Sequence, residues 1–240
     1  MLALFDMDGT LFPGDSQLRF AGRILSRHPW RRLYLLLLLP CALLAALRII
    51  RTERMKRIFL SYLYRMPLGQ VEREAQAFAE ENIRPILYPG VLQRLRDHQA
   101  AGDHCILVSA SPSFYTEHIG RMLGFDDIIS TPIVMQPAMP LVPAIEPPGN
   151  NKGGTKLIRL RKKGIIPPDG KTPDSICYTD SRADLPMLSV CEQGVLVNPS
   201  AQLANQAPEH HWQIIRQPLP WHGKRAFLAF ILKNIIGFRA

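Results

Sequence analysis

The segment MLALFDMDGTLF, residues 1–12, decides the fold of this chain. It opens on apolar residues of strand-like character, reaches Asp6 and Asp8, and leaves through the turn residue Gly9. Because side chains alternate along a strand, the two aspartates are expected to point to the same side. Open α/β sheets bind ligands at the carboxyl ends of their strands. The pattern therefore predicts two carboxylates that collect a divalent cation and offer one oxygen as a nucleophile.

An ordinary turn is the alternative interpretation of these residues, since Asp and Gly are common in turns. Later features weigh against it. Ser109 follows an apolar run, Lys156 begins a helix, and the pair Asp180 and Asp184 follows a second apolar run. With the two aspartates, these residues resemble the motifs of the haloacid dehalogenase superfamily of phosphotransferases. Those motifs are DxDGT, a Ser or Thr after a hydrophobic strand, a Lys, and D-x-x-x-D.

The composition indicates one α/β core that carries an insertion. The chain has 240 residues, of which 47% are hydrophobic and 20% charged. Its net charge of +9 implies an anionic partner, which could be a phosphorylated substrate, an anionic membrane surface or nucleic acid. Nucleic acid is not expected, because the sequence has no RNP, zinc-finger or basic-leucine pattern.

The cysteines and the N-terminus predict a cytoplasmic protein. The cysteines lack C-x-x-C spacing, which favours reduced core thiols over a disulfide framework or a zinc site. They are Cys41, Cys105, Cys177 and Cys191. The first aspartate comes at position 6, so no signal peptide is expected before it.

Residues 33–47, LYLLLLLPCALLAAL, form an apolar run with basic residues on both sides. As a helix the run would measure about 22 Å, short of a hydrocarbon core of about 30 Å, and Pro40 interrupts it. Two interpretations of the run remain open: a buried helix, or a re-entrant or interfacial segment whose basic flanks meet anionic head groups. The density of leucine and the basic flanks favour the membrane surface, and hence the inner face of the cytoplasmic membrane. The basic residues are Arg31, Arg32, Arg48, Arg51, Arg54, Lys56 and Arg57.

The expected fold is a Rossmann-like parallel-sheet core, residues 1–12 and 89–211, with a helical cap inserted at residues 13–88. In the superfamily that this chain resembles, an insertion at this position is the type-1 cap, which covers the active site. A helix is expected from Gln17, capped by Asp15 or Ser16. Residues 212–240 form a basic apolar tail that could either dock onto the protein or lie in a membrane interface. Strands are expected at residues 104–108, 126–134, 141–145, 175–179 and 194–198.

The remaining predicted site residues follow from strand ends and helix starts. Ser109 is predicted to hold a phosphate oxygen, and Ser111 is interpreted as a helix cap. Lys156 begins a helix after a glycine-rich loop that lacks P-loop spacing, and Lys152 in that loop is expected to be solvated. Asp180 is predicted to complete a cation site with Asp6 and Asp8.

Asp184 has two open interpretations. It could orient the metal's waters or Lys156, or it could complement a helix dipole, which is worth about 0.3–1 kcal/mol. The resemblance adds a family pattern, a glycine three residues before the motif lysine, which Gly153 and Lys156 meet.

The resemblance implies two-step phosphoryl transfer with Mg²⁺. Asp6 would attack phosphorus, and Asp8 would protonate the leaving oxygen and then activate water. Mg²⁺ would be held by Asp6, Asp180 and the backbone carbonyl of Asp8, and Ser109 and Lys156 would neutralise the phosphate oxygens.

The segments GTLFPGDS and SASPSF resemble bacterial phosphatidylglycerophosphate phosphatases, which carry a similar leucine-rich basic segment. A membrane-lipid phosphate is therefore the expected substrate. Phosphoserine phosphatases usually show a Glu soon after DxDxT and a Ser-Gly-Gly after the second strand, and this sequence has neither. The alternatives are a phosphatase of a small soluble phosphomonoester such as phosphoserine, or a catalytically silent membrane-associated scaffold.

Overall fold

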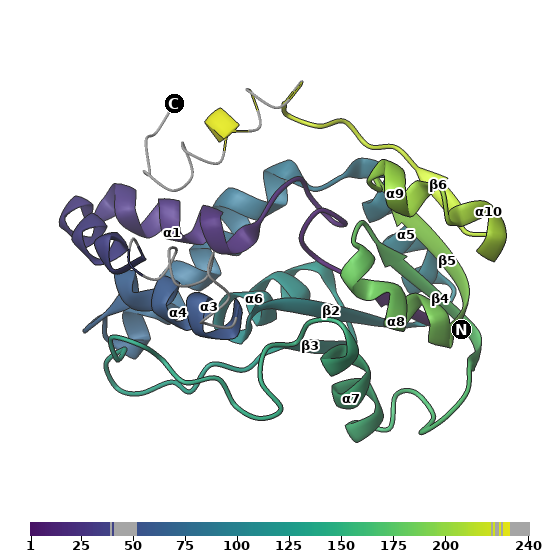
Figure 1. Ribbon diagram of the computed structural model, residues 1–240, viewed down its shortest axis with the longest axis horizontal. Coiled ribbons are helices and arrows are strands. Elements are labelled where there is room, and N and C mark those ends of the chain that lie inside the picture. Colours follow the sequence, from purple (N-terminus) through teal and green to yellow (C-terminus); the bar gives the residue numbers. More distant parts are fainter. Residues whose placement is uncertain (39, 41–51, 222, 224–225, 227, 231–240) are drawn as a thin grey trace.

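The computed structural model describes residues 1–38, 40, 52–221, 223, 226 and 228–230 (Figure 1). In this part of the chain, six strands form one parallel sheet in the order β3-β2-β1-β4-β5-β6. The sheet confirms the expected α/β fold. The strands are β1 Leu2–Phe5, β2 His104–Pro112, β3 Asp127–Thr131, β4 Thr172–Thr179, β5 Cys191–Val197 and β6 Gln213–Ile215.

The central strand β1 fixes the position of everything that follows it. It pairs in parallel with β2 on one side and β4 on the other, with Leu2 opposite His104 and Ser175. The chain adds β2 and β3 on one side of β1 and then crosses to β4 on the other side. A crevice opens at the carboxyl ends of strands where the order reverses in this way, so it lies beyond β1 and β4.

Both faces of the sheet are covered by helices, which explains why its strands are almost continuously apolar. On β1, Phe5 belongs to a hydrophobic cluster on one face and Leu4 to a cluster on the other, as alternation along a strand requires. The first cluster includes residues of α5 Pro89–Ala100 and α6 Ser113–Leu123. The second includes residues of α7 Gly154–Lys162, α8 Leu185–Val190, α9 Ala201–Ala204 and α10 Ala207–His210.

The described residues between β1 and β2 are largely helical, as expected for residues 13–88. Asp15 caps the first helix by accepting a hydrogen bond of 3.0 Å from the backbone N–H of Leu18, so one of the two predicted caps is confirmed. The elements are α1 Ser16–Arg27, η1 Pro29–Leu37, α3 Thr52–Phe59, η2 Leu60–Leu63, α4 Leu68–Phe78, η3 Ala79–Ile83 and η4 Arg84–Ile86. We call residues 13–88 the insertion.

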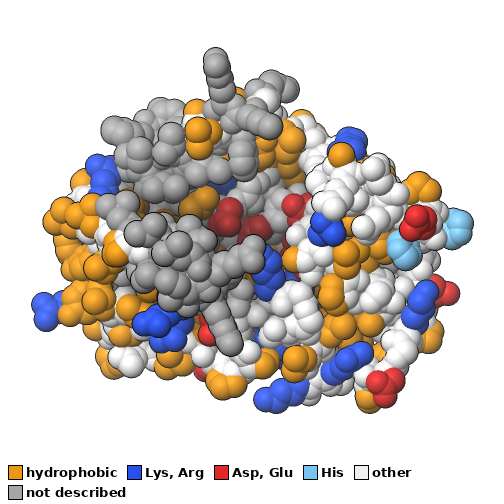
Figure 2. Space-filling model, in the orientation of Figure 1, with side chains coloured by type: hydrophobic (Ala, Val, Ile, Leu, Met, Phe, Trp, Pro, Cys, Tyr) orange, Lys and Arg blue, Asp and Glu red, His pale blue; other side chains and the backbone are white. Residues whose placement is uncertain are grey.

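The start of the leucine run is a short 3-10 helix, η1, with an exposed apolar side. Leu33 is 67% exposed and Leu36 58% exposed, whereas Leu35 packs against the hydrophobic cluster. Hydrophobic side chains gather over this end of the insertion (Figure 2). No helix among the described residues is long and apolar enough to cross a membrane. Residues 39 and 41–47 of the run lie outside the described part of the chain.

Some of the basic residues that flank the run are used inside the protein. The side chain of Arg31 is buried and donates to the backbone carbonyls of Tyr62 and Tyr64, at 2.7 and 2.8 Å. Arg57 donates to the carbonyl of Pro143 at 2.8 Å. The expectation that the basic flanks meet anionic head groups is therefore wrong for Arg31, which is buried and bound by backbone carbonyls of the fold. Arg57 is half-buried and binds one such carbonyl.

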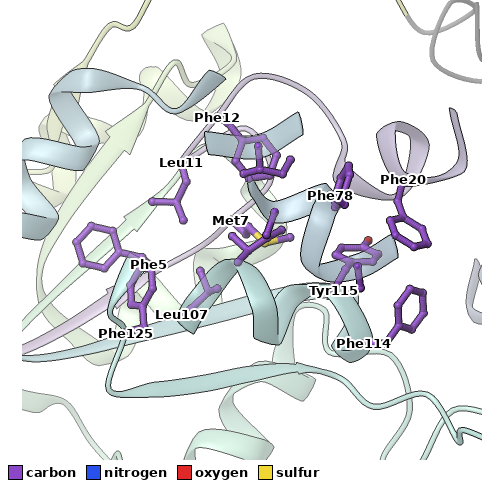
Figure 3. Packing of buried hydrophobic residues seen from close by; sticks show 14 of the residues in the cluster. Phe5, Met7, Leu11, Phe12, Phe20, Phe78, Leu107, Phe114, Tyr115 and Phe125 are labelled. Carbon is purple, nitrogen blue, oxygen red and sulfur yellow. The ribbon is translucent and has the colours of Figure 1, made fainter. Parts of the chain in front are cut away.

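One hydrophobic cluster runs without a break from the sheet into the insertion (Figure 3). Phe5 on β1 contacts Phe125, while in the insertion Phe20 lies 5.2 Å from the rings of Phe78 and Tyr115. Tyr115 belongs to α6, which covers the sheet, so Phe20 packs directly on the core. The insertion therefore shares its hydrophobic interior with the core, and this shared interior sets its position over the sheet.

Two expectations about strands need correction. Residues 141–145 do not form a strand; only an isolated bridge joins Ile133 and Ile145. Pro140 and Pro143 lack the N–H groups that a ladder needs, which explains the missing strand. The edge strand β6 was not expected, because its three residues are too few and too exposed to give an alternating pattern.

The buried charge pairs of the insertion yield a stability prediction. Arg23 binds Glu74 and Glu81, at 2.8 Å each, and Glu74 is only 8% exposed. Arg23→Ala leaves Glu74 buried with Arg27 as its remaining ion-pair partner, so we expect the free energy of unfolding to fall by about 3 kcal/mol. Urea unfolding measures this change.

Arg84→Ala is the matched control, because Arg84 also pairs with a glutamate, Glu80, but at the surface, where about half of each side chain is exposed. We expect its effect on urea unfolding to be hardly measurable. Equal effects of the two substitutions would contradict the structural importance of the buried pair.

Candidate active site

The predicted catalytic aspartates lie where the strand order reverses. Asp6 and Asp8 follow β1, and Asp180 follows β4. The hydroxyl of Thr10 lies 3.3 Å from Asp6 Oδ2 and 3.5 Å from Asp180 Oδ1, so these two carboxylates converge. Gly9 makes the approach possible: its φ is +81°, and a Cβ there would lie 2.3 Å from Asp180 Oδ2.

Lys156 is buried among carboxylates. Its Nζ donates to Asp6 Oδ1 at 2.7 Å and contacts Asp184 Oδ1 at 2.8 Å. Thr179 Oγ1 donates to the other oxygen of Asp184 at 2.8 Å. Burial disfavours the charged amine, but Asp6 and Asp184 outweigh it and hold the pKa of Lys156 above its ordinary value. Asp184 is thus placed to orient Lys156, which is one of its two predicted roles.

Asp6 and Asp8 have different surroundings. Burial raises the pKa of Asp6 to about 6, against the opposing charge of Lys156. Burial and then the charge of Asp15 raise the pKa of Asp8 to about 7. The carboxylate of Asp8 accepts two hydrogen bonds: Oδ1 accepts from the N–H of Ser16 at 2.6 Å, and Oδ2 accepts from Ser111 Oγ at 2.5 Å. Asp8 can therefore hold or release a proton near neutral pH.

Of the two serines after the apolar part of β2, Ser111 differs from its predicted role. The helix cap of α6 is Pro112, and Ser111 lies within β2, so the interpretation of Ser111 as a cap is wrong. The pairing register of β2 is irregular between Val108 and Pro112, and in this stretch the Ser111 hydroxyl donates to Asp8. Ser109 is 1% exposed, and its Oγ accepts from the N–H of Ser111 at 3.0 Å. Its role in binding phosphate remains a prediction.

A cavity of about 360 Å³ surrounds these groups. Figure 2 shows acidic side chains at the bottom of a hollow on the face it displays. All the predicted site residues except Ser109 line the cavity, together with side chains from the insertion and from the glycine-rich loop. The additional lining residues are Asp15, Gln17, Lys56, Ala110, Ser111, Asn150, Lys152, Ser181 and Ala183. Lys152 is exposed, as expected, but it stands at this cavity.

Lys56 is the site residue that sequence reasoning placed wrongly, on the membrane-facing flank of the leucine run. Its Nζ donates to the carbonyl of Ala110 at 2.5 Å and to Asn150 Oδ1 at 2.7 Å. Burial lowers the pKa of Lys56 to about 8 despite the charges of Asp8 and Asp15. Glu53, one turn earlier, accepts from the N–H of Asn150 at 3.1 Å. Both contacts fasten α3 to the glycine-rich loop, and no sequence motif marks them.

The charges of the site fit a divalent cation. Asp6, Asp180 and Asp184 repel one another, and burial together with this repulsion raises the pKa values of Asp6 and Asp180. Among the described residues, no three acidic, histidine or cysteine side chains form a complete metal-binding group. Asp6 and Asp180 would therefore supply two carboxylates. Mg²⁺ is commonly bound in this way, through one or two carboxylates and several waters.

Known proteins resemble this chain over most of its length. It is 27% identical to a histidinol-phosphatase of Neisseria meningitidis, covering 89% of this chain and 97% of the relative. It is 24% identical to phosphoserine phosphatase SerB1 of Mycobacterium tuberculosis, covering 88% and 69%. A solved structure of a Bordetella pertussis protein of unknown function has a TM-score of 0.73 and 29% identity, covering 89% and 97%.

The family assignment rests on a match that includes all the predicted site residues. Residues 3–189 match the model of the haloacid dehalogenase-like hydrolases. This range extends from β1, before Asp6, to α8, after Asp184. The expectation of a hydrolytic enzyme is confirmed, and relatives named as phosphatases agree with it. The chain belongs to the haloacid dehalogenase-like hydrolase family.

Proposed function

We propose that this protein is a Mg²⁺-dependent phosphomonoester hydrolase that forms an aspartyl-phosphate on Asp6. The observation that carries the proposal is the contrast between two neighbouring carboxylates. Asp6 touches the ammonium of Lys156, which favours its ionised, nucleophilic form. Asp8 accepts hydrogen bonds from Ser16 and Ser111 and has a pKa of about 7, which suits a group that gives and takes protons.

The reaction follows from these two roles. A carboxylate oxygen of Asp6 attacks phosphorus, the bond from phosphorus to the leaving oxygen breaks, and Asp8 gives that oxygen its proton. Asp8 then accepts a proton from a water that attacks the same phosphorus. The bond to Asp6 breaks and inorganic phosphate leaves.

The other residues stabilise charge. Lys156 and a serine hydroxyl, from Ser109 as predicted or from Ser111 at the cavity, neutralise the phosphoryl oxygens. Asp6, Asp180 and the backbone carbonyl of Asp8 would hold Mg²⁺, which supplies further positive charge to the transferred phosphoryl group. The insertion acts as a cap, because it contributes Asp15 and Lys56 to the cavity wall.

A small polar phosphomonoester fits the cavity best as substrate. Asp15, Lys56 and Lys152 place both signs of charge around the aspartates, so the leaving group would carry polar or charged atoms of its own. The names of the two relatives, a histidinol-phosphatase and a phosphoserine phosphatase, support this class of substrate. Lys56 stands at the catalytic cavity and not on a surface beside the leucine run, which removes one reason for expecting a lipid.

A membrane-lipid phosphate is the second candidate substrate, and one specific observation supports it. Trp30 is 54% exposed beside the exposed Leu33 and Leu36, at the start of the leucine run. Such a surface with nearby cations fits the interface of an anionic bilayer. In this second proposal the protein is peripheral at the inner face of the cytoplasmic membrane.

The catalytic roles predict different losses in two variants. Asp6→Asn cannot form the aspartyl-phosphate, so we expect no turnover of any phosphomonoester. Asp8→Asn removes the acid and base, and we expect steady-state turnover to fall by about 10²–10⁴-fold. With 4-nitrophenyl phosphate, whose leaving group needs little protonation, Asp8→Asn should still form a phosphoenzyme that acid quenching traps. Near-normal turnover by Asp6→Asn would overturn the mechanism.

The raised pKa values predict how stability depends on pH. Without a divalent cation, the folded protein holds protons on Asp6 and Asp8 that the unfolded chain loses at its ordinary pKa of 3.8. The free energy of unfolding should therefore fall as pH rises from about 4 to about 7. Mg²⁺ competes with those protons, so its stabilising effect should grow over the same range. Thermal unfolding at pH 5 and pH 7.5, with and without Mg²⁺, measures both effects.

Asp180→Asn serves as the control for the metal effect, since it removes one of the two proposed carboxylate ligands. We expect Mg²⁺ to raise the Tm of this variant much less than that of the wild type. A Mg²⁺ effect that is equal at the two pH values, or unchanged in Asp180→Asn, would count against the proposed cation site.

The second candidate is tested by vesicle binding. The wild type should sediment with phosphatidylglycerol vesicles at low salt, and the double variant Leu33→Ser, Leu36→Ser should bind them less. Turnover of a soluble aryl phosphate should stay the same. Ile158→Ser is the matched control, because Ile158 is 52% exposed but lies on α7. If the wild type stays in the supernatant, the lipid substrate is discarded and the soluble phosphomonoester remains.

A further inference from the structure

The C-terminal tail returns from the edge of the sheet to the active site. After β6 it passes over the molecule towards α1 (Figure 1). Gln217 fastens its beginning: its N–H donates to Asn198 Oδ1 at 2.8 Å, and its carbonyl accepts from Asn198 Nδ2 at 3.1 Å. The side chain of Gln217 accepts from the N–H of Gly90 at 3.2 Å. These bonds hold the beginning of the tail beside Asn198, which follows β5, and beside Gly90 in α5.

Two aromatic residues of the tail then meet the beginning of the insertion. The rings of Trp221 and Phe230 lie 4.6 Å apart. The Phe230 ring lies against Gly14, where an added Cβ would come within 2.9 Å of it, and 4.7 Å from the guanidinium of Arg19. Gly14 is six residues after Asp8, so the tail packs beside the catalytic loop.

Between the tail and the catalytic loop lies a second cavity, of about 380 Å³. It shares Asp8, Asp15 and Asp180 with the catalytic cavity, so the two spaces meet at the carboxylate that would protonate the leaving oxygen. The wall that faces these carboxylates is largely apolar. Its apolar side chains are Leu18, Leu219, Trp221 and Phe230, with the ring of Tyr88 beside them.

We propose that this second cavity is the subsite for an apolar part of the leaving group, such as an aromatic ring, and that Trp221 and Phe230 determine this specificity. The proposal rests on the phosphatase function proposed above. A phosphate held near Lys156 puts its leaving oxygen at Asp8, where the second cavity begins. A ring attached to that oxygen would lose its hydration against two aromatic side chains, which favours binding through burial and ring contacts.

The test compares two substrates in each variant. 1-Naphthyl phosphate carries an aromatic ring system, whereas the ethyl group of ethyl phosphate is too small to reach the aromatic wall. We expect Phe230→Ala and Trp221→Ala each to lower the ratio of kcat/KM for the naphthyl over the ethyl ester about tenfold, chiefly through KM. Leu228→Ala is the matched control, since Leu228 belongs to the same tail but is 58% exposed and lines neither cavity. Its ratio should equal that of the wild type.

A purely structural tail gives a different result. In that case Phe230→Ala lowers the Tm or the turnover of both esters equally and leaves their ratio unchanged, which would overturn the proposal. Phe230→Leu guards against misfolding, because it keeps apolar volume and should restore part of the ratio.

Binding without turnover separates this proposal from the phosphatase function. In the Asp6→Asn background, 1-naphthyl phosphate should bind more tightly than inorganic phosphate, and Phe230→Ala should remove most of that difference, as measured by calorimetry. If the wild type hydrolyses neither ester but this binding difference is present, the proposed function fails and the subsite stands. If the esters are hydrolysed and the binding difference is absent, the subsite fails alone.

Discussion

The buried contact of Lys156 with Asp6 and Asp184 is the interaction on which the site depends. It joins the start of α7, the end of β1 and the segment after β4, which are far apart in the sequence. Removing a buried charge from such a cluster would leave the remaining charges unpaired in a medium that solvates them poorly. The contact exists only when β1 and β4 lie side by side, so the geometry of the site depends on the order of the strands in the sheet.

Two aspartates separated by one residue acquire different properties because their neighbours differ. Asp6 points to the lysine from the core, whereas Asp8 is held by Ser16 of the insertion and Ser111 of β2. The insertion is therefore part of the site. Its helices share one hydrophobic interior with the core, from Phe5 to Phe20.

Two parts of the insertion, its middle and its beginning, are held in place from outside. On one side, Glu53 and Lys56 bind the glycine-rich loop before α7. On the other, the aromatic tail packs on the residues that follow the catalytic loop. The basic residues show why net charge alone is a weak guide to a partner: Arg31, Lys56 and Arg57 donate hydrogen bonds to backbone carbonyls of this protein. A charge assigned to a membrane from its sequence position can thus be satisfied within the fold.

The sequence by itself determined the features that depend on near neighbours. The α/β class, the strand before Asp6 and the Asp15 cap all follow from alternation, helical period and turn chemistry within a few residues. Only the tertiary structure decided which serine reaches Asp8, that Lys56 turns into the cavity, and that the tail forms a wall beside it. Those outcomes depend on how elements far apart in the chain pack together. Local periodicity carries no information about such distances, because the side chains that set them come from the whole fold.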